Sequence, residues 1–537
     1  MATFFYATDG QNAWHNSSKW VNNSYHECDW VMKEKFSQIQ DDFYNATQFP
    51  CDNSTGRIQH LWLWTNNLKG TIPREFFWLD SLKSISLLAN PLLVGSIPTE
   101  IGLLQNLEAL ALGSTSLTGK IPTEFGWLSN LSSVLLLSNQ LSGPIPSEFG
   151  RLTHLLNLFL DTNQLTSTIP TTLGHLTNLS YLQIHGNMLI GTIPSELFQA
   201  TNLISLSLYQ NDLSGTLSTN VGMLTNLVEL PLSGNQLVGT IPSQLGTCSK
   251  LSTVALADNA FNGLIPSEIG TLSSMRILGL YMNLLSGSIS SELGNLEKLE
   301  ELYLWENKLQ GSISSYFGSA TNLKEVELSN NNLDFALPSE LGMWKDLTLL
   351  SLHSNGITGS IPSEIGNLSN LRTLNLEGNR LTGTIPHQLG ALENLEELYL
   401  YENVLSGTLS STIGAMTSLQ DFRAMRNRLT GLLPPQIGNL KNLTVLHLYT
   451  NALSGALPSE IGNLYFLREL ALDNNFFTGS LSSELGRLRQ LNALWLYNNL
   501  FDQSIPSEMG TMNELQLLDL SINLLSSALP SQLGELQ

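Results

Sequence analysis

Leucine and asparagine recur along most of the chain in one repeating pattern of apolar and polar positions. The pattern is LxLxxNxLxG, and its asparagine returns every 24 residues, without an insertion, from Asn139 to Asn523. Three less regular copies precede this run, at Asn66, Asn90 and Thr115, so the chain carries about twenty repeats. Self-similarity at such a period indicates small structural units that stack side by side on one continuous core.

The positions within one repeat predict its local structure. In LxL the two leucines alternate with outward-pointing residues, which is the period of a short strand with one buried face. The asparagine that follows is a polar side chain in an apolar core, so its amide must bond to the backbone of neighbouring turns. Glycine and the proline of the IP dipeptide favour turns, and a glutamate two residues after the IP position suits the start of a short helical turn.

These features predict an α/β solenoid of about 20 repeats of 24 residues. Its strands would form one parallel sheet, and residues 57–537 would make up the solenoid behind a non-repeating N-terminal cap, residues 1–56. Thr115 replaces the repeated asparagine and offers one hydroxyl in place of an amide. We therefore expect a local weak point near the third repeat.

Composition and charge exclude several classes of function. The net charge of -21 argues against nucleic acid or an anionic membrane surface as a partner, because both would be repelled. The chain contains no run of 18 apolar residues that would span a bilayer, and no secretory signal follows Met1. It also lacks HExxH, CxxC, GxSxG, P-loop and GxGxxG motifs, and its nine histidines are scattered. We expect no enzyme activity, no cofactor and no metal site.

One histidine has a specific neighbour. His185 follows Asp161 by one repeat in the same outward column, which places the two side chains about 5 Å apart. A salt bridge is the simpler interpretation, and a catalytic dyad or a pH sensor stays open.

Aromatic residues concentrate on the outward side of the strands. The positions two, four and six residues before each repeated asparagine hold 12 of the 23 tryptophans and tyrosines, where even spreading would place roughly three. Exposed tyrosine and tryptophan on a rigid sheet are typical of binding hot spots, although aromatic residues also favour strands for structural reasons. We interpret the excess as a recognition surface.

Two groups of these residues are the candidate ligand-binding site. Each combines aromatic rings with carboxylates, they lie four repeats or about 19 Å apart, and an extended basic peptide could touch both. Arginines beside the second group either neutralise Asp421 and Glu402 or clamp a ligand carboxylate. The candidate residues are Tyr281, Tyr303, Trp305, Glu325 and Glu327 in the first group, and Glu377, Tyr399, Tyr401, Arg423, Arg426 and Tyr449 in and around the second.

The full repeat, SGxIPxxLGxLxxLxxLxLxxNxL, resembles the plant-type leucine-rich repeat of receptor-like kinase ectodomains, receptor-like proteins and polygalacturonase inhibitors. The resemblance implies a superhelix with its parallel sheet on the concave face. The opening FFYATDGQNAWHNSSKW and the pair ECDW and PCDNSTGRI resemble the N-terminal cap of that family, which implies a disulfide between Cys28 and Cys51 across a longer insert than usual. The chain stops within a repeat, so we expect a partial ectodomain without a C-terminal cap.

Further features fit an extracellular or cell-surface protein. Asn-x-Ser/Thr sequons in the repeats predict glycosylation at Asn130, Asn178, Asn367 and Asn442, although their number is near what chance gives in so polar a chain. The third cysteine, Cys248, stands alone within the repeats and is expected to be a buried thiol.

The sequence favours a non-catalytic recognition scaffold, a receptor-type ectodomain that binds a peptide or protein on its concave face. Two alternatives stay open: a secreted enzyme inhibitor resembling the polygalacturonase inhibitors, and a cell-wall protein that binds polysaccharide through its tyrosines and tryptophans.

Overall fold

The computed structural model describes residues 7–8 and 57–535. They belong to two compact units, Met1–Phe261 and Asn262–Gln537. Most of the predicted cap, with Cys28 and Cys51, lies outside the described residues. The predicted boundary between cap and solenoid at residue 57 therefore stays a prediction.

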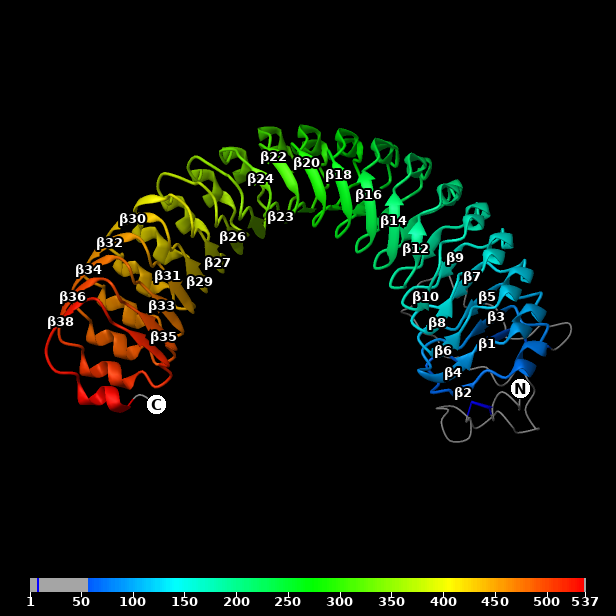
Figure 1. Ribbon diagram of the computed structural model, residues 1–537, viewed down its shortest axis with the longest axis horizontal. Helices are drawn as coiled ribbons and strands as arrows, with labels where there is room; N and C mark the ends of the chain where they lie inside the picture. Colours follow the sequence, from blue (N-terminus) through cyan, green and yellow to red (C-terminus); the bar gives the residue numbers. More distant parts are fainter. Residues whose placement is uncertain (1–6, 9–56, 536–537) are drawn as a thin grey trace. The chain divides into compact units, whose positions relative to one another are not determined.

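In each unit the LxL segments form short parallel strands that stack repeat upon repeat (Figure 1). Partners are 24 residues apart in most pairs, as in Tyr303 opposite Glu327. In the first unit these strands are β1 (His60–Trp62), β3 (Ser84–Ser86), β5 (Ala109–Ala111), β7 (Ser133–Leu135), β9 (Asn157–Phe159), β11 (Tyr181–Gln183), β13 (Ser205–Ser207), β15 (Glu229–Pro231) and β17 (Thr253–Ala255). In the second unit they are β19 (Ile277–Gly279), β21 (Glu301–Tyr303), β23 (Glu325–Glu327), β25 (Leu349–Ser351), β26 (Thr373–Asn375), β27 (Glu397–Tyr399), β29 (Asp421–Arg423), β31 (Val445–His447), β33 (Glu469–Ala471), β35 (Ala493–Trp495) and β37 (Leu517–Asp519).

A second set of parallel strands follows the repeated asparagines. It comprises β2 (Lys69–Thr71), β4 (Leu92–Ser96), β6 (Ser116–Gly119), β8 (Gln140–Gly143), β10 (Gln164–Leu165), β12 (Ile190–Thr192), β14 (Asp212–Thr216), β16 (Gln236–Thr240) and β18 (Ala260–Gly263), and then β20 (Leu284–Gly287), β22 (Lys308–Gly311), β24 (Asn332–Leu333), β28 (Ser406–Thr408), β30 (Arg428–Gly431), β32 (Ala452–Gly455), β34 (Phe476–Ser480), β36 (Leu500–Gln503) and β38 (Leu524–Leu525).

A five-residue 3-10 helix closes each repeat on the side away from the LxL strands (Figure 1). The helices are η2 (Arg74–Trp78), η3 (Thr99–Leu103), η4 (Thr123–Trp127), η5 (Ser147–Arg151), η6 (Thr171–His175), η7 (Ser195–Gln199), η8 (Thr219–Met223) and η9 (Ser243–Thr247) in the first unit, and η10 (Ser267–Thr271), η11 (Ser291–Asn295), η12 (Ser315–Ser319), η13 (Ser339–Met343), η14 (Ser363–Asn367), η15 (His387–Ala391), η16 (Ser411–Ala415), η17 (Pro435–Asn439), η18 (Ser459–Asn463), η19 (Ser483–Arg487), η20 (Ser507–Thr511) and η21 (Ser531–Glu535) in the second.

The residue before each helix sets its start. In most repeats this residue is the proline of IP, whose extended backbone and missing N–H suit a position where no intrahelical bond is made. At four of the five serines that replace proline, as at Ser218 and Ser482 but not at Ser290, the hydroxyl accepts a hydrogen bond from the backbone N–H two residues later. The predicted glutamates lie in the first turn, as Glu148 does in η5.

The repeated asparagine is the polar centre of each repeat, as the pattern predicts. Asn331 Nδ2 donates to the carbonyl oxygens of Leu304 in the preceding repeat, at 3.0 Å, and of Leu328 in its own repeat, at 3.2 Å. Its Oδ1 accepts from the N–H of Leu309 at 2.9 Å. Because Asn331 is only 7% exposed, these bonds take the place of bonds to water at its amide. Each asparagine of this column, the asparagine ladder, joins two repeats.

Thr115 makes fewer of these bonds. Its hydroxyl reaches the carbonyl oxygen of Leu112 in its own repeat and the side chain of Asn139 in the next. An asparagine at position 115 would accept a hydrogen bond from the backbone N–H of Leu93. With threonine there, this N–H donates instead to the carbonyl oxygen of Asn90. The expected weak point at the third repeat stays a prediction, and these bonds are its structural basis.

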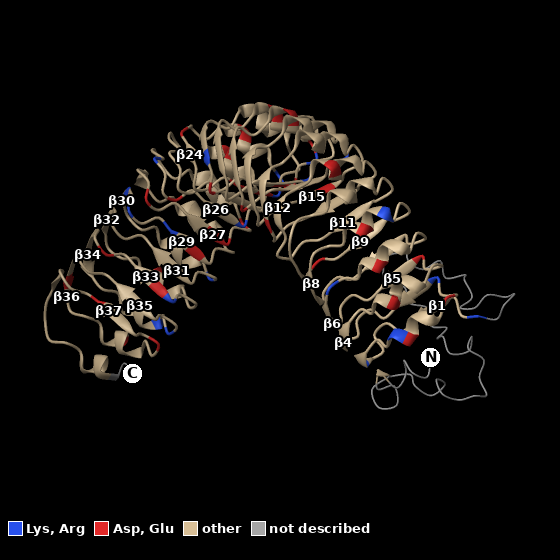
Figure 2. Ribbon diagram, turned by 45° about the vertical axis from the view of Figure 1, so that its right-hand side comes forward, with Lys and Arg blue, Asp and Glu red and all other residues tan. Residues whose placement is uncertain are grey.

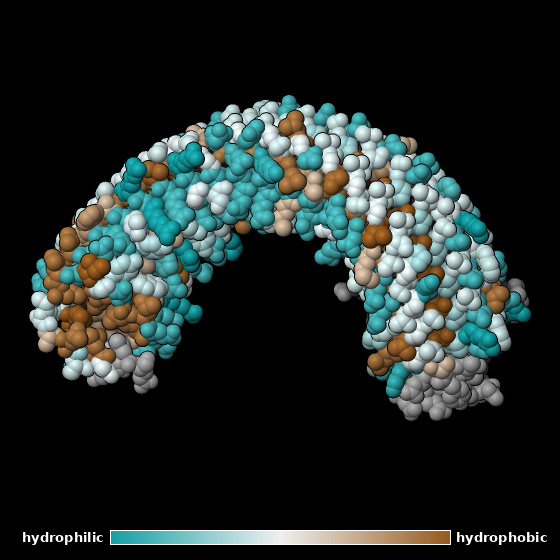
Figure 3. All heavy atoms as spheres, viewed as in Figure 1, coloured by the Kyte–Doolittle hydropathy of each residue, from teal (hydrophilic) through white to brown (hydrophobic). Residues whose placement is uncertain are grey.

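Cys248 is fully buried, as expected, and burial raises the pKa of its thiol to about 11. In the second unit Phe476, Leu500 and Leu524 are exposed one residue after successive ladder asparagines. Hydrophobic surface gathers toward the C-terminal end of this unit (Figure 3). This stripe runs along β34, β36 and β38, at the edge of the repeats and away from the LxL strands.

Replacing Asn331 with alanine should destabilise the second unit by about 2–4 kcal/mol, because backbone groups of two repeats lose their partners in a water-free interior. Chemical denaturation and amide hydrogen exchange of the adjoining repeats measure the loss. The matched control is Asn332→Ala, one residue later and exposed, which should change stability by less than about 0.5 kcal/mol. Equal effects of the two substitutions would contradict the ladder's role.

Candidate functional site

The LxL segments of the second unit place the predicted site residues on one face of one sheet, except Arg426, which lies in the turn after β29, one residue before Asn427. Residues two, four and six positions before each ladder asparagine point away from the core, while the leucines between them are buried, as Leu302 and Leu304 are at 1% and 0% exposed. Strand register then sets which outward residues of neighbouring repeats lie side by side. Tyr399 is opposite Arg423, just as Tyr303 is opposite Glu327.

Three of the predicted aromatic residues form a first aromatic cluster, Tyr281, Tyr303 and Trp305. The rings of Tyr281 and Trp305 are stacked, with centroids 4.5 Å apart and an interplanar angle of 10°. Tyr303 meets Tyr281 edge to face, with centroids 6.4 Å apart. All three side chains are partly exposed, so the cluster presents a preformed aromatic surface on the sheet.

Carboxylates surround the first aromatic cluster. The hydroxyl of Tyr303 donates to Glu325, and burial together with nearby glutamates raises the pKa of that phenol well above its usual range. Burial, and then the charge of Glu325, raises the pKa of Glu327. Within the described part of the chain, Glu301, Glu325 and Glu327 have no Lys, Arg or His within ion-pair distance. The cluster therefore carries uncompensated negative charge.

The nearby basic residues Arg276 and Lys324 are already paired with another carboxylate, that of Glu300. Arg276 Nε lies 2.8 Å from Glu300 Oε1, and Lys324 Nζ lies 2.7 Å from Glu300 Oε2. Hydrogen bonds from these two side chains, Arg276 first, lower the pKa of Glu300 to about 2. Glu300 precedes β21 and belongs to the flank of the repeat. The charge of Glu301 is also among the causes that raise the pKa of Arg276, so Arg276 partly compensates Glu301, whereas Glu325 and Glu327 have no such basic neighbour among the described residues.

In the second group acidic and basic residues both occur, on and around β29 (Figure 2). Arg423 forms a two-pronged contact with Asp421, in which both Nε and one terminal nitrogen lie 2.9 Å from a carboxylate oxygen. Its guanidinium also lies 5.7 Å from the centre of the Tyr399 ring. Arg426 is paired with Glu402. The arginines thus contact the carboxylates that the simpler sequence interpretation assigns to them.

The remaining residues of the second group extend it along the sheet. Glu377 is within 3.9 Å of His353, and its hydrogen bond with Tyr401 is the second cause, after burial, that raises the pKa of that phenol. Tyr449 packs near His447, with ring centroids 6.1 Å apart. In the sheet, β23, β25 and β26 lie between the strands of the two groups, β21 and β27.

His447 is a site residue that sequence reasoning missed. Its Nε2 lies 3.0 Å from Glu469, and its ring meets Trp495 edge to face at 6.2 Å. Burial, and then the charge of Arg423, lowers the pKa of His447. Its position four residues before a ladder asparagine, one strand from Arg423, is the sequence signal that could have identified it.

In the first unit the pair predicted from the repeat spacing is formed. His185 Nε2 lies 3.6 Å from Asp161 Oδ2, and the His185 ring stacks on Tyr209 at a centroid distance of 4.0 Å. The Nδ1 atom of His185 lies 3.1 Å from the hydroxyl of Ser207. Burial lowers the pKa of His185 and raises the pKa of Asp161, so it disfavours the charged forms of both groups, and the contact is a salt bridge only when His185 is protonated.

The predicted glycosylation sites occupy two kinds of position. Asn130, Asn178 and Asn442 form part of a second column of asparagines, the flank asparagines, whose Nδ2 atoms donate to a backbone carbonyl of the preceding repeat at 2.8–2.9 Å. The sequence pattern did not suggest this second structural role. Asn367 differs, because it ends η14 and is exposed.

Among the described residues, no group of three or more His, Cys, Asp or Glu side chains is arranged to hold a metal ion. None of the helices formed by the described residues is both long and apolar enough to cross a membrane. The site on the sheet consists of aromatic, acidic and arginine side chains, which bind ligands through stacking, ion pairs and hydrogen bonds.

Family models match several segments of the chain. The model described as leucine-rich repeat region matches residues 338–453, and the model described as Leucine Rich Repeat matches residues 226–248, 298–320 and 322–344. No curated protein matches the chain.

Solved structures of plant receptors are similar to most of the chain. The ectodomain of the membrane receptor kinase GASSHO1/SCHENGEN3 from Arabidopsis thaliana, in complex with CASPARIAN STRIP INTEGRITY FACTOR 2, is 37% identical over 88% of this chain, with a TM-score of 0.76. This chain covers 60% of that ectodomain. The ectodomain of the Arabidopsis receptor kinase HAESA, in complex with an extended IDA peptide hormone, is 32% identical, with 92% of this chain and 88% of that one covered and a TM-score of 0.79. The plant peptide hormone receptor RGFR1, in complex with RGF2, is 33% identical, with 89% and 88% covered and a TM-score of 0.70.

The raised pKa of Glu327 can be tested directly. Replacing Glu325 with glutamine removes a like charge, so the pKa of Glu327 should fall but stay above its ordinary value, because burial is the larger cause. Since the folded-state pKa is raised, Glu327 should favour folding most at low pH and lose that contribution as pH rises through the folded pKa. Carboxyl-carbon NMR of the labelled protein follows the titration. An unchanged Glu327 pKa in Glu325→Gln would contradict the proximity of the two charges.

Proposed function

The chain belongs to the plant-type leucine-rich-repeat family, and from that premise we propose that it is a non-catalytic, receptor-type ectodomain at the cell surface. Its ligand is a peptide or protein, which lies along the LxL strands of the second unit. The observation that carries the proposal is the first aromatic cluster, with its stacked rings and uncompensated carboxylates. The relatives named above were solved with peptide or protein ligands, which supports the same class of ligand here.

The aromatic surface supports recognition because its rings are arranged before any ligand arrives. Tyr281 and Trp305 hold each other in a stack, and Tyr303 is fixed by its bond to Glu325. A ligand that covers these rings gains apolar contact with little loss of side-chain entropy, which is the usual property of a binding hot spot.

The charge distribution supports a ligand with a basic group. Glu325 and Glu327 lie on the same face of β23, beside Tyr303, and their mutual repulsion is part of the reason for the raised pKa of Glu327. A guanidinium or ammonium group placed there would relieve this repulsion and pack against the ring faces. The second group offers both signs of charge already paired, so it would add polar contacts to any extended ligand.

The ligand class can be tested by selecting synthetic ten-residue peptides on the full chain. We expect enrichment of peptides that contain arginine or lysine, and replacement of the selected arginine by citrulline should weaken binding about tenfold or more. Citrulline keeps the shape of the side chain and removes its charge. Enrichment of acidic or purely apolar peptides would contradict the charge argument, and binding of plant oligosaccharides in place of peptides would favour the polysaccharide alternative.

The aromatic anchors can be tested with the same peptides. Replacing Tyr303 or Trp305 with alanine should weaken the selected peptides about 10- to 100-fold, because each ring lies at the centre of the proposed contact. The matched control is Tyr316→Ala, since Tyr316 is an exposed tyrosine of the same unit on η12, away from the strands. Isothermal titration calorimetry measures the affinities. Equal losses for Tyr303→Ala and Tyr316→Ala would remove the basis for placing the ligand on the sheet.

Binding should also depend on pH through Glu327. A bound cation favours the ionised carboxylate, so affinity should fall as pH is lowered through the raised pKa of Glu327. The variant Glu327→Gln should bind more weakly at neutral pH and show a flatter pH profile. An unchanged profile in this variant would show that the cation is bound elsewhere.

A further inference from the structure

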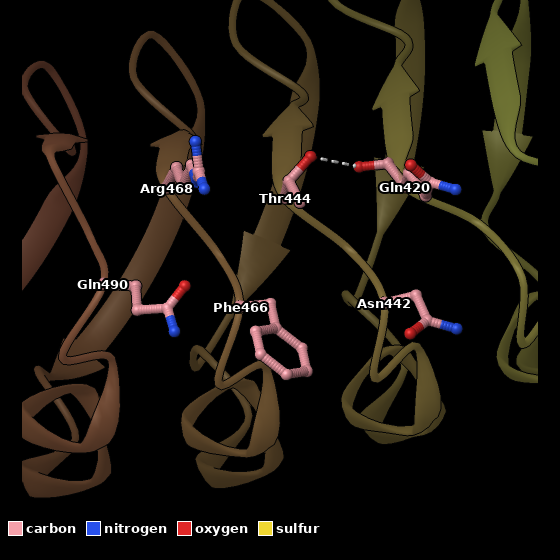
Figure 4. Close-up of a pocket in the computed structure, with 6 residues that line it drawn as sticks. All are labelled: Gln420, Asn442, Thr444, Phe466, Arg468 and Gln490. Atoms are coloured by element: carbon pink, nitrogen blue, oxygen red, sulfur yellow. Dashed lines mark hydrogen bonds between the residues drawn. The ribbon is translucent and has the colours of Figure 1, made fainter.

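A shallow polar hollow lies on the flank of the second unit, beside the start of the LxL strands (Figure 4). It encloses about 200 Å³. Its lining residues come from four successive repeats: Gln420, Asn442, Thr444, Phe466, Arg468 and Gln490. None of them belongs to the aromatic and acidic surface proposed to bind the ligand.

Two of the lining residues, Asn442 and Thr444, are the first and last residues of the sequon Asn442-Leu443-Thr444. Asn442 is exposed and is one of the flank asparagines described above. Its Nδ2 atom donates to the carbonyl oxygen of Thr417 at 2.9 Å, which uses one of its two hydrogens. Replacement of the other hydrogen by a sugar carbon would leave this structural bond in place.

The opposite side of the hollow has the chemistry of a sugar-binding surface. Phe466 is 51% exposed, and its ring lies on the side of its repeat that faces the repeat of Asn442 (Figure 4). Aromatic rings pack against the C–H groups on one face of a pyranose through dispersion. Elsewhere along the hollow, Arg468, Gln420 and Gln490 supply hydrogen-bonding groups for sugar hydroxyls.

The first unit repeats this arrangement at the same positions of the repeat. A hollow of about 520 Å³ there is lined by Lys83, Asn106, Glu108, Asn130, Ser132 and His154, so it also contains both ends of a sequon, Asn130 and Ser132. The sequon at Asn178 provides a contrast. It lines neither of these two hollows, and the next repeat places Asn202 and Ile204 where the second unit has Phe466 and Arg468.

We propose that Asn442 carries an N-linked glycan whose first sugars lie in this hollow, against Phe466, so that the glycan is an ordered part of the flank. The inference rests on the proposed cell-surface function, because the sugar is transferred from a lipid-pyrophosphate-linked oligosaccharide during secretion. In that transfer the bond between Asn442 Nδ2 and sugar C1 forms, the bond from C1 to the pyrophosphate oxygen breaks, and an Nδ2 proton is lost. The glycan covers an aromatic ring that the protein alone leaves in water.

The test uses the full chain expressed through the secretory pathway of plant cells. Glycopeptide mass spectrometry should find Asn442 occupied, and Thr444→Ala should abolish that occupancy while Thr444→Ser keeps it. On the folded protein, an exomannosidase should trim the glycan at Asn442 about fivefold more slowly than the glycan at Asn178, as expected from one additional aromatic contact. Phe466→Ala should remove this difference, and Phe466→Tyr should preserve it.

Several outcomes would overturn the proposal. They are an unmodified Asn442, equal trimming at Asn442 and Asn178, and a trimming difference that persists in Phe466→Ala. The trimming rate at Asn178 in each variant controls for a general change in folding. Peptide binding by Thr444→Ala should equal that of the unaltered chain, so failure of the glycan proposal and failure of the proposed ligand site are measured separately.

Discussion

The buried asparagine of the repeat is the interaction on which the rest of each unit depends. Its amide takes the place of water for carbonyl and N–H groups of two successive repeats, as Asn331 does for Leu304, Leu328 and Leu309. Because such a group is costly to bury unsatisfied, every repeat must present its backbone to the next one in the same register. That requirement fixes the strand spacing, and the inward leucines then have only one way to pack.

A constraint of this kind separates residues that build the fold from residues that are free to vary. Tyr281, Tyr303 and Trp305 occupy positions where the neighbouring repeats require neither size nor polarity, since serine, alanine and proline stand at equivalent places such as Ser233, Ala255 and Pro231. The aromatic rings are therefore not needed to form strands. Their stacking with one another is a property of these particular repeats, which is why it supports a role in recognition.

Much of the fold follows from the repeat alone, whereas the site follows only in part. The period predicts the strands, the buried leucines and the partner of each ladder asparagine, because all of these depend on register. The bonding of the flank asparagines was not predicted, since Asn442 stands in a polar context where any exposed residue would fit. The stacking of Tyr281 on Trp305 was also beyond sequence reasoning, because it depends on side-chain rotamers. His447 could have been found by looking for histidine, as well as tyrosine and tryptophan, at the positions two, four and six residues before each ladder asparagine.

The difference between the two acidic groups can be explained by the same register. On a strand, residues two apart share a face, and residues 24 apart lie on neighbouring strands, so each outward carboxylate has a small, countable set of neighbours. For Asp421 that set includes Arg423, and in the turns after the strands Glu402 meets Arg426, which is also 24 residues away. For Glu325 the set is Glu301, Glu327 and Leu349, which contains no base. The uncompensated charge at the first aromatic cluster thus results from which residues occupy a few outward positions of the strands. The backbone at these positions would also accept a lysine or an arginine. A surface that keeps repelling charges beside a preformed stack of rings is less stable than its neutral equivalent, and a cationic ligand is the interaction that would reverse this balance.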